Sequence, residues 1–308
     1  MSHISRYFSP PPLETDPLLT FHFPWTSESL IIARCRPPSS PKFREIPVSA
    51  DQHFKAGQLQ EALDAQLKAV KADPADHGKR IFLFELLVFA GDLERARKQI
   101  SLVDYGELEL DAAVLTYNKL LDAEAARRNL FTIGTAPRFF GEVPEHIHWR
   151  LDALACLREG RTADAMARLA KADEAAPVVK GRLNDKPFES LRDYDDVMLT
   201  VLELVARDAY YWVPLEQVAS LAMNAPRFPR DLIWFPASLE LKSGEAGEVF
   251  LSALYVDSHA EADDQIKLGR ATDWKGENDA PTRGIGAKLF RVGDGDVPLV
   301  DWRRLQLD

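Results

Sequence analysis

The chain has 308 residues, a formal charge of −10 and 46% hydrophobic side chains, which is enough length for two domains and enough apolar material for a core. An acidic chain lacks the basic face that nucleic acid or an anionic membrane surface requires, so both are excluded as main partners. No apolar run approaches the ~20 residues of a membrane span, and the first residues lack the pattern of a signal peptide. Cys35 and Cys156 lie in unlike segments, so we expect no disulfide framework and a cytoplasmic location.

Residues 1–47 differ in composition from the rest of the chain. The stretches SPPPLETDP and RPPSSPKFREIP are rich in proline and serine and show no helical period. Such a composition buries too little apolar surface to offset the entropy lost on ordering. We therefore expect a disordered head that is dispensable for folding.

Residues 48–177 carry a helical repeat. The stretch GQLQEA begins at Gly57 and GDLERA at Gly91, an offset of 34 residues, and a third copy, GRTADA, begins at Gly160. Pro74 and Pro177 each follow a repeat glycine by 17 residues. A 34-residue period with small residues at the helix crossing and a closing proline resembles the tetratricopeptide repeat. We expect about seven helices here, the longest over 108–131.

After Pro177 the pattern changes to that of a small α+β domain over residues 178–308. Asn184-Asp185 predicts a hairpin turn, and residues 193–208 predict one helix with Asp193 or Asp195 as its N-cap. Short apolar segments separated by turn sequences favour a partly closed antiparallel sheet or barrel of five or six strands that starts at YYWV. The predicted strands lie at 209–213, 231–241, 248–256, 265–270, 287–292 and 298–307.

The aromatic run YYWV should be a half-buried strand. Alternation places Tyr210 and Trp212 on one face and Tyr211 and Val213 on the other. A structural role for Trp212 is favoured over contact with a partner, and its loss should damage the fold.

No residues form a catalytic or metal-binding constellation. His146 and His148 are two apart on a predicted helix, so their side chains point apart and cannot share an ion. Gly284 and Gly286 lead into a strand rather than a helix, which argues against a phosphate loop. We predict no catalytic residue, no metal and no cofactor.

Five charged residues lie beside aromatic strands and are the best candidates for a polar site: Glu216, Arg230, Asp231, Arg270 and Asp273. Either they pair with each other or cap turns, or they belong to an enzyme site in the C-terminal sheet. An enzyme site would require two of the carboxylates to face each other in a pocket.

Ordered sequence blocks in the C-terminal half resemble the ImpE/TagJ family of accessory proteins of bacterial type VI secretion. The blocks are RDAYYWVPLEQVASL, PRDLIWFPASLEL, GEVFLSALYVDS, IKLGRATDW and GIGAKLFRVGD, preceded by GRLNDKPFESLRDYDD. The resemblance spans about residues 50–308, and the chain departs from the family pattern in its head and at Leu215 and Ser252.

The resemblance implies a non-enzymatic adaptor with a tetratricopeptide-like part and a smaller C-terminal domain. It also implies association with the contractile sheath through the N-terminal helix of the small sheath subunit, TssB, and a link to the ClpV ATPase that recycles sheath. A general repeat scaffold unrelated to secretion, or an enzyme, are the alternatives.

The partner surface is expected to be a groove that holds an amphipathic helix. The repeats are slightly favoured for this groove over the C-terminal sheet, where Trp234 and Trp274 would be the anchors. The acidic net charge suits a helix that carries Lys or Arg beside its apolar face. The candidate partner-binding residues are Tyr211, Glu216, Arg230, Asp231, Trp234, Arg270, Asp273 and Trp274.

Overall fold

The computed structural model describes residues 6–7, 48–104, 106, 108–276 and 279–308. Of the head predicted to be disordered, the structure describes Arg6–Tyr7, which form strand β1 and pair with β10 (Ala271–Lys275), contrary to the prediction at these two residues. For residues 1–5 and 8–47 the prediction lies outside the described residues. No helix in the described part of the chain is long and apolar enough to span a bilayer.

Seven helices lie between residues 48 and 177 of the described chain, as the repeat pattern predicts. They are α1 (Ala50–Lys55), α2 (Leu59–Ala72), α3 (His77–Phe89), α4 (Leu93–Ile100), α5 (Leu108–Thr132), α6 (Glu145–Arg158) and α7 (Thr162–Ala175). The glycines that mark the period, Gly57, Gly91 and Gly160, each lie in the turn between two paired helices with φ of 79°, 80° and 73°. A left-handed conformation of this kind favours glycine, which explains the spacing of the three residues.

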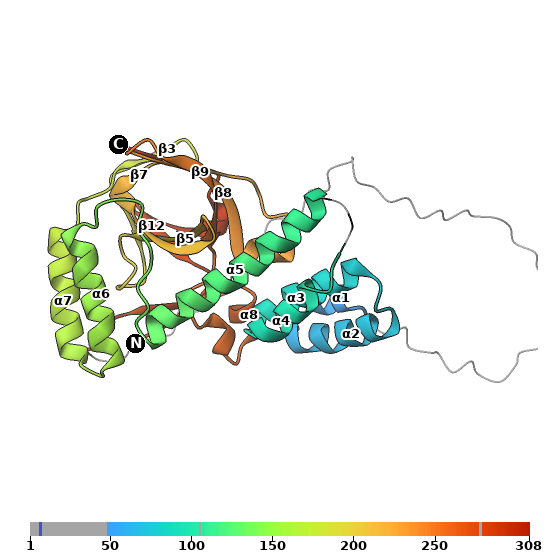
Figure 1. Cartoon of the computed structure of the whole chain (residues 1–308). Helices are drawn as coiled ribbons and strands as arrows, with labels where there is room; N and C mark the ends of the chain where they lie inside the picture. Colours follow the sequence, from blue (N-terminus) through green and yellow to red (C-terminus); the bar gives the residue numbers. More distant parts are fainter. Residues whose placement is uncertain (1–5, 8–47, 105, 107, 277–278) are drawn as a thin grey trace, which may run out of the picture.

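The C-terminal half forms an antiparallel barrel-like sheet (Figure 1). Its eight strands have the order β3-β2-β14-β7-β8-β9-β5-β6. They are β2 (Gly181–Leu183), β3 (Lys186–Phe188), β5 (Val201–Ala206), β6 (Ala209–Pro214), β7 (Val218–Met223), β8 (Trp234–Leu241), β9 (Ala246–Ser252) and β14 (Arg304–Leu307). The predicted turn at Asn184 and Asp185 is confirmed, since both residues have positive φ and join β2 to β3.

Two smaller sheets complete this half. One contains β4 (Leu191–Asp193), β12 (Leu289–Val292) and β13 (Gly295–Pro298), and the other contains β1, β10 (Ala271–Lys275) and β11 (Arg283–Gly286). The prediction of five or six strands is therefore too low. The strand at YYWV does not start the sheet either, because β2 to β5 precede β6, which lies at an edge of the eight-stranded order.

The helix predicted over 193–208 is wrong. Asp193 ends β4, the Asp195 carboxylate accepts hydrogen bonds from the backbone N–H groups of Val197 and Met198 in a turn, and β5 begins at Val201. All six residues of β5 are buried, and the strand pairs with β6 and β9 on its two sides. Tertiary pairing thus overrides a local pattern that a helix fits equally well.

The strand predicted over 265–270 is also wrong. This segment forms the short helix α8 (Asp264–Lys267), and the Asp263 side chain caps it by accepting from Gln265 N at 2.8 Å. Asp264 in turn accepts a hydrogen bond from Leu59 N at 2.8 Å, at the start of α2. Asp263 thus caps the start of α8, and Asp264 fixes the segment against α2.

The barrel wall has apolar residues on both faces. Tyr211 and Val213 pack inside the barrel with Phe235 and Trp302, whereas Tyr210 and Trp212 pack outward in the core that the helices share. The predicted alternation along YYWV is therefore confirmed, but the strand is buried on both faces and not half-buried, because the helices cover its outer face.

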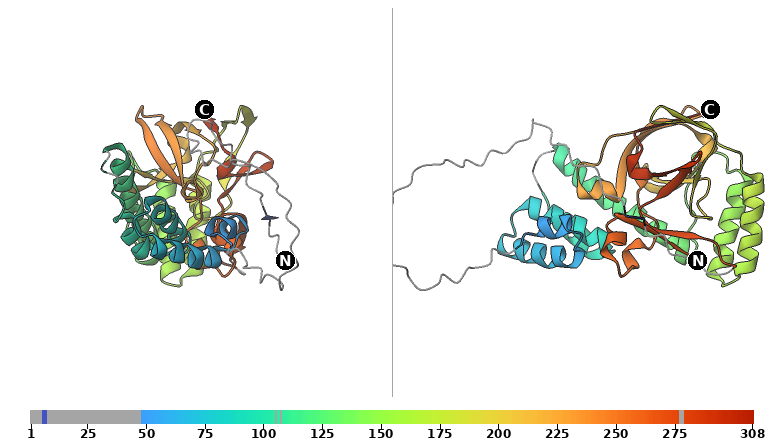
Figure 2. Two further views of the ribbon diagram at one scale, coloured as in Figure 1. Left: turned by 90° about the vertical axis from the view of Figure 1, so that its right-hand side faces the viewer. Right: turned by 180° about the vertical axis from the view of Figure 1, so that it is seen from behind.

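The long helix α5 runs across the outside of the barrel. Helices α1–α4 lie toward one end of α5, and the α6–α7 pair lies toward its other end (Figures 1 and 2). Residues of all these helices and of β5, β6 and β8 belong to one hydrophobic cluster. The helical and sheet parts are thus joined through a continuous core.

Candidate partner-binding pocket

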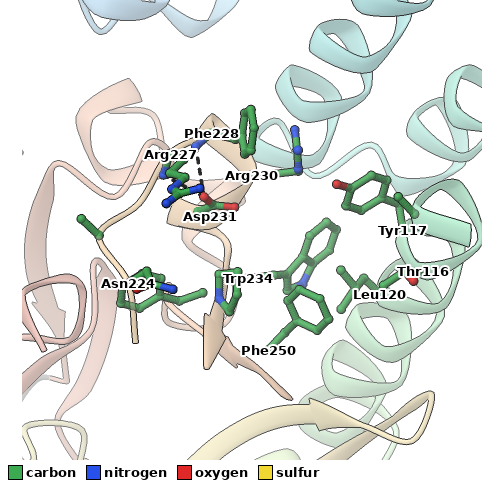
Figure 3. Close-up of a pocket in the computed structure, with 14 residues that line it drawn as sticks. Thr116, Tyr117, Leu120, Asn224, Arg227, Phe228, Arg230, Asp231, Trp234 and Phe250 are labelled. Atoms are coloured by element: carbon green, nitrogen blue, oxygen red, sulfur yellow. Dashed lines mark hydrogen bonds between the residues drawn. The ribbon is translucent and has the colours of Figure 1, made fainter. Parts of the chain in front are cut away.

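A pocket of about 400 Å³ opens between α5 and the segment that leads into β8 (Figure 3). Helix α5 contributes Tyr117 and Leu120, the segment before β8 contributes Phe228, β8 contributes Trp234, and β9 contributes Phe250. These large apolar side chains come from parts of the chain that only the fold brings together. The volume is within the range of pockets that hold ligands.

The short 3₁₀ helix η3 (Pro229–Leu232) shapes one wall of this pocket. The Asp231 carboxylate accepts hydrogen bonds from Arg227 N at 2.8 Å and from Phe228 N at 3.0 Å. These bonds fix the turn that holds Phe228 at the rim, where the side chain is 50% exposed. Because Phe228 adjoins the other apolar side chains of the pocket, it extends a contiguous apolar surface, which is the kind of surface that contacts a partner.

Arg230 connects the pocket to the helical repeats. Its guanidinium group pairs with Glu85 of α3 and lies 4.0 Å from the centre of the Phe228 ring and 5.0 Å from that of Tyr117. Burial raises the pKa of Glu85 to about 7, although Arg230 acts in the opposite direction. Arg230 is therefore a fixed part of the wall.

A second polar site lies further along α5 and is closed. Arg127 of α5 donates to both oxygens of Glu203, at 2.8 and 3.1 Å. Lys288 Nζ lies 2.8 Å from Glu203 and 3.3 Å from Asp193. The side chains of these four residues are at most 4% exposed, and in this buried charge cluster (Arg127, Glu203, Lys288 and Asp193) each cation pairs with an anion. Arg127 also lies 3.5 Å from the carboxylate of Glu124.

The cluster shifts the pKa values of its two acids in opposite directions. Burial raises the pKa of Asp193 to about 6. Burial also opposes ionisation of Glu203, but Arg127 and Lys288 outweigh it and hold the pKa of this carboxyl well below its usual value. Glu203 is thus the anion around which the cluster is built.

Hydrogen bonds extend the cluster into the barrel wall. The Tyr210 hydroxyl donates to Glu203, and Trp212 Nε1 donates to the Tyr210 oxygen at 2.6 Å. The Tyr255 hydroxyl donates to Asp193 at 2.5 Å. The cavity beside Arg127 and Tyr255 has only about 30 Å³, room for about one water, so no substrate can enter.

Comparisons with known proteins agree with the fold. The family described as ImpE protein matches residues 185–306. The type VI secretion system accessory component TagJ of Pseudomonas aeruginosa is 37% identical over 265 residues, which cover 85% of this chain and 92% of that protein. The chain belongs to the ImpE/TagJ family of type VI secretion accessory proteins.

A solved structure supports the same architecture for this family member. The crystal structure of protein VPA1032 from Vibrio parahaemolyticus has a TM-score of 0.77 and 26% sequence identity, and covers 84% of this chain and 97% of its own. The resemblance predicted from the C-terminal sequence blocks, and the fold class of helical repeats followed by a β-rich domain, are confirmed.

In this ImpE/TagJ chain, three of the eight candidate residues meet at the pocket. Arg230, Asp231 and Trp234 line it together. Tyr211 instead lies inside the barrel, with its ring stacked on Phe140 at 4.4 Å. Trp274 belongs to a separate aromatic group with Tyr194, so Trp234 and Trp274 do not form one pair of anchors.

The remaining three candidates each contact another element or a neighbouring backbone group. Glu216 pairs with the buried His146 of α6. Arg270 donates to the carbonyl oxygens of Phe54 and Lys55, at the end of α1. Asp273 accepts a hydrogen bond from the backbone N–H of Trp274 at 2.9 Å. Within the described chain, no two of the candidate carboxylates share the pocket.

The two histidines lie as the helical spacing predicts. His146 is buried, and its Nδ1 lies 3.3 Å from Thr200 Oγ1, whereas His148 is exposed. Leu215 and Ser252, where the sequence departs from the family pattern, are both buried. Neither position lines the pocket.

Sequence reasoning missed the aromatic wall of the pocket. Tyr117 and Leu120 belong to a helix whose pattern only indicates burial, and Phe250 belongs to a strand that is equally apolar. Phe228 could have been noticed, because it stands between prolines in the polar stretch NAPRFPRD, where a core strand is not expected. Nothing in the sequence indicates that these residues meet.

Proposed function

We propose that this chain is a non-enzymatic cytoplasmic adaptor of a type VI secretion system. In this proposal it binds the N-terminal helix of the small sheath subunit, TssB, and links the sheath to ClpV-dependent recycling. Membership of the ImpE/TagJ family supports the secretion context. The pocket between α5 and β8 supports the mode of binding.

The observation that carries the proposal is the exposed Phe228 beside the apolar pocket. A partner helix docks by inserting apolar anchors at i, i+3, i+4 and i+7 into a hydrophobic groove. Tyr117, Trp234 and Phe250 provide such a groove, and Phe228 extends it to the surface. The binding surface proposed here therefore lies against the sheet rather than along the repeats.

The charged groups in the wall of the pocket favour binding over catalysis. Both hydrogen bonds to Asp231 Oδ2 come from backbone N–H groups, and Arg230 is paired with Glu85. A general base needs a free carboxylate or imidazole within reach of the substrate. Asp231, the acid that lines this pocket, is instead engaged in holding its wall.

Titration calorimetry of the full chain with a peptide of the TssB N-terminal helix tests this proposal. We expect micromolar or tighter binding, about −8 kcal/mol. Phe228→Ser should weaken it at least about tenfold, because truncation of an aromatic side chain that the partner covers costs on the order of 2 kcal/mol.

The matched control is Ile133→Ser. Ile133 is 73% exposed and follows the last residue of α5, at the end of that helix away from the pocket. We expect no change in affinity for this variant, and no binding of a peptide with scrambled apolar positions. Equal affinities of the wild type and Phe228→Ser would place the partner elsewhere.

A further inference from the structure

The pocket contains an indole N–H group that has no hydrogen-bond acceptor among the residues that the structure describes. Trp234 is 3% exposed and lines the pocket, yet its indole N–H makes no hydrogen bond within the described residues. By contrast, the indole N–H of Trp212 donates to Tyr210. The Trp234 N–H is not one of the buried polar groups without a partner, so water can still reach it in the open pocket. An occupant that excludes this water without offering an oxygen atom would leave the N–H unsatisfied, which is costly.

The rim of the pocket also carries a cation that is not neutralised. Arg227 is exposed, and its guanidinium group forms no ion pair with any residue that the structure describes. Arg230, three residues further along the same turn, is already paired with Glu85. The nearby Asp231 carboxylate accepts from the backbone N–H groups of Arg227 and Phe228. The side chain of Arg227 is therefore left for a partner.

We infer that the pocket selects a partner helix in which an Asp or Glu stands one helical turn from the apolar anchor and pairs with Arg227. This inference rests on the function proposed above. Residues three or four apart on a helix are neighbours, so one turn can place the anchor over Trp234 and the carboxylate at the rim. Figure 3 shows Trp234 within the pocket and Arg227 to one side of it.

The charge at the rim of the pocket is thus opposite in sign to the net charge of the chain. A charge of −10 by itself favours a basic partner. Specificity, however, depends on the charges that meet at the contact. Of the charged residues that line the pocket, Arg230 is paired with Glu85 and Asp231 is held by backbone N–H groups, whereas the guanidinium group of Arg227 is exposed and forms no ion pair with a described residue. A helix with Lys at the same position would face the guanidinium group and be rejected.

A charge-exchange experiment on the full chain tests the inference. TssB helix peptides in which each Asp and Glu is changed in turn to Gln or to Lys are titrated into the wild type and into Arg227→Glu. We expect one acidic position whose change to Gln lowers wild-type affinity about fivefold or more. Arg227→Glu should lower affinity for the unchanged peptide at least about tenfold, and the Lys peptide should restore it.

Two further variants separate the carboxylate contact from general effects. Arg192→Glu makes the same charge change at an exposed residue of β4, outside the pocket, and should leave affinity unchanged. Trp234→Phe removes the indole N–H while keeping an aromatic ring, and should weaken binding several-fold. If, for every acidic peptide position, the affinity loss from Arg227→Glu and the loss from the peptide change simply add, no acidic residue pairs with Arg227 and the inference is overturned.

A small probe keeps the test independent of TssB. The indole ¹H–¹⁵N resonance of Trp234 is followed while 4-phenylbutyrate or 4-phenylbutylamine, which share an apolar body but differ in charge, is added. We expect a shift with the acid that is lost in Arg227→Ala, and little shift with the amine. If the TssB peptide does not bind but this pattern holds, the proposed function fails and the inference stands; an equal response to both probes overturns the inference.

Discussion

Helix α5 meets the barrel at two places that differ in almost every respect. Near Tyr117 and Leu120 it borders an open pocket with an apolar wall, an indole N–H without an acceptor and an unpaired guanidinium group among the described residues. Near Arg127 it enters a closed cluster in which each charge faces an opposite charge. Charged side chains therefore join the two parts of the molecule at the cluster, whereas at the pocket Arg230 is paired with Glu85 and Arg227 remains available to a partner.

The difference shows that a charged residue beside an aromatic strand has no fixed role. Glu203 and Arg230 both lie next to tyrosines, and both are paired. What separates them is access, since the cavity at the cluster holds about one water and the pocket has about 400 Å³. A binding site needs hydrogen-bond donors that have no acceptor within the fold, whereas a buried structural contact needs every donor to be paired.

The strongest test of this comparison is Glu203→Ala. The change leaves Arg127 and Lys288 without their shared anion in a buried site, which should cost about 3–5 kcal/mol. Urea unfolding of the full chain measures the loss. The control is Glu189→Ala, which breaks the exposed pair with Lys180 and should not change the unfolding midpoint measurably. Equal stability of the Glu203 variant and the wild type would show that the cluster does not hold the two parts together.

Trp212→Ala tests the core beside the charge cluster, to which Trp212 is linked through Tyr210. Trp212 is fully buried, so its removal should cost about 3–5 kcal/mol in the free energy of unfolding. Unfolding should be measured on the full chain, because Trp212 packs in the core shared with the helices.

Trp212→Phe is the matched variant. It keeps most of the apolar contact and loses the hydrogen bond to Tyr210, so it should cost less, about 1 kcal/mol for the hydrogen bond itself. Unchanged unfolding of Trp212→Ala together with lost peptide binding would assign Trp212 to the partner surface instead.

A smaller effect is expected from pH at Glu85, which links the pocket to the repeats. Its pKa is raised from 4.5 to about 7 by burial, so the folded protein holds a proton that the unfolded chain releases. Stability from this group is therefore present below about pH 4.5 and is lost as the pH rises to about 7, by roughly 1–3 kcal/mol. In Glu85→Gln this pH-dependent loss of stability is absent, because glutamine does not titrate.

The difference in unfolding free energy between the wild type and Glu85→Gln isolates the contribution of Glu85 from those of the other titrating groups. Asp193 acts with the same sign and Glu203 with the opposite sign, but both are present in the wild type and in Glu85→Gln. Urea unfolding from pH 4.5 to 7.5 should show the wild type losing stability relative to the variant. A constant difference across this range would mean that Glu85 titrates normally.

Much of the fold follows from the sequence because its signals are local. The repeat glycines adopt the left-handed conformation that their spacing implies, and the Asn184-Asp185 turn requires only neighbouring residues. The alternation along YYWV follows from the geometry of a strand. Ordered sequence blocks, matched to a known family, indicate the architecture of the C-terminal half.

Tertiary structure decided the rest, because the contacts join residues far apart in the chain. Residues 201–206 are apolar enough for a helix or a strand, and only pairing with β6 and β9 selects the strand. Arg127 and Glu203 are 76 residues apart, and no local pattern reports that they meet. The pocket likewise exists only where α5 crosses β8, so the sequence supplied Arg230, Asp231 and Trp234 while the crossing of these two elements determined which side chains surround them.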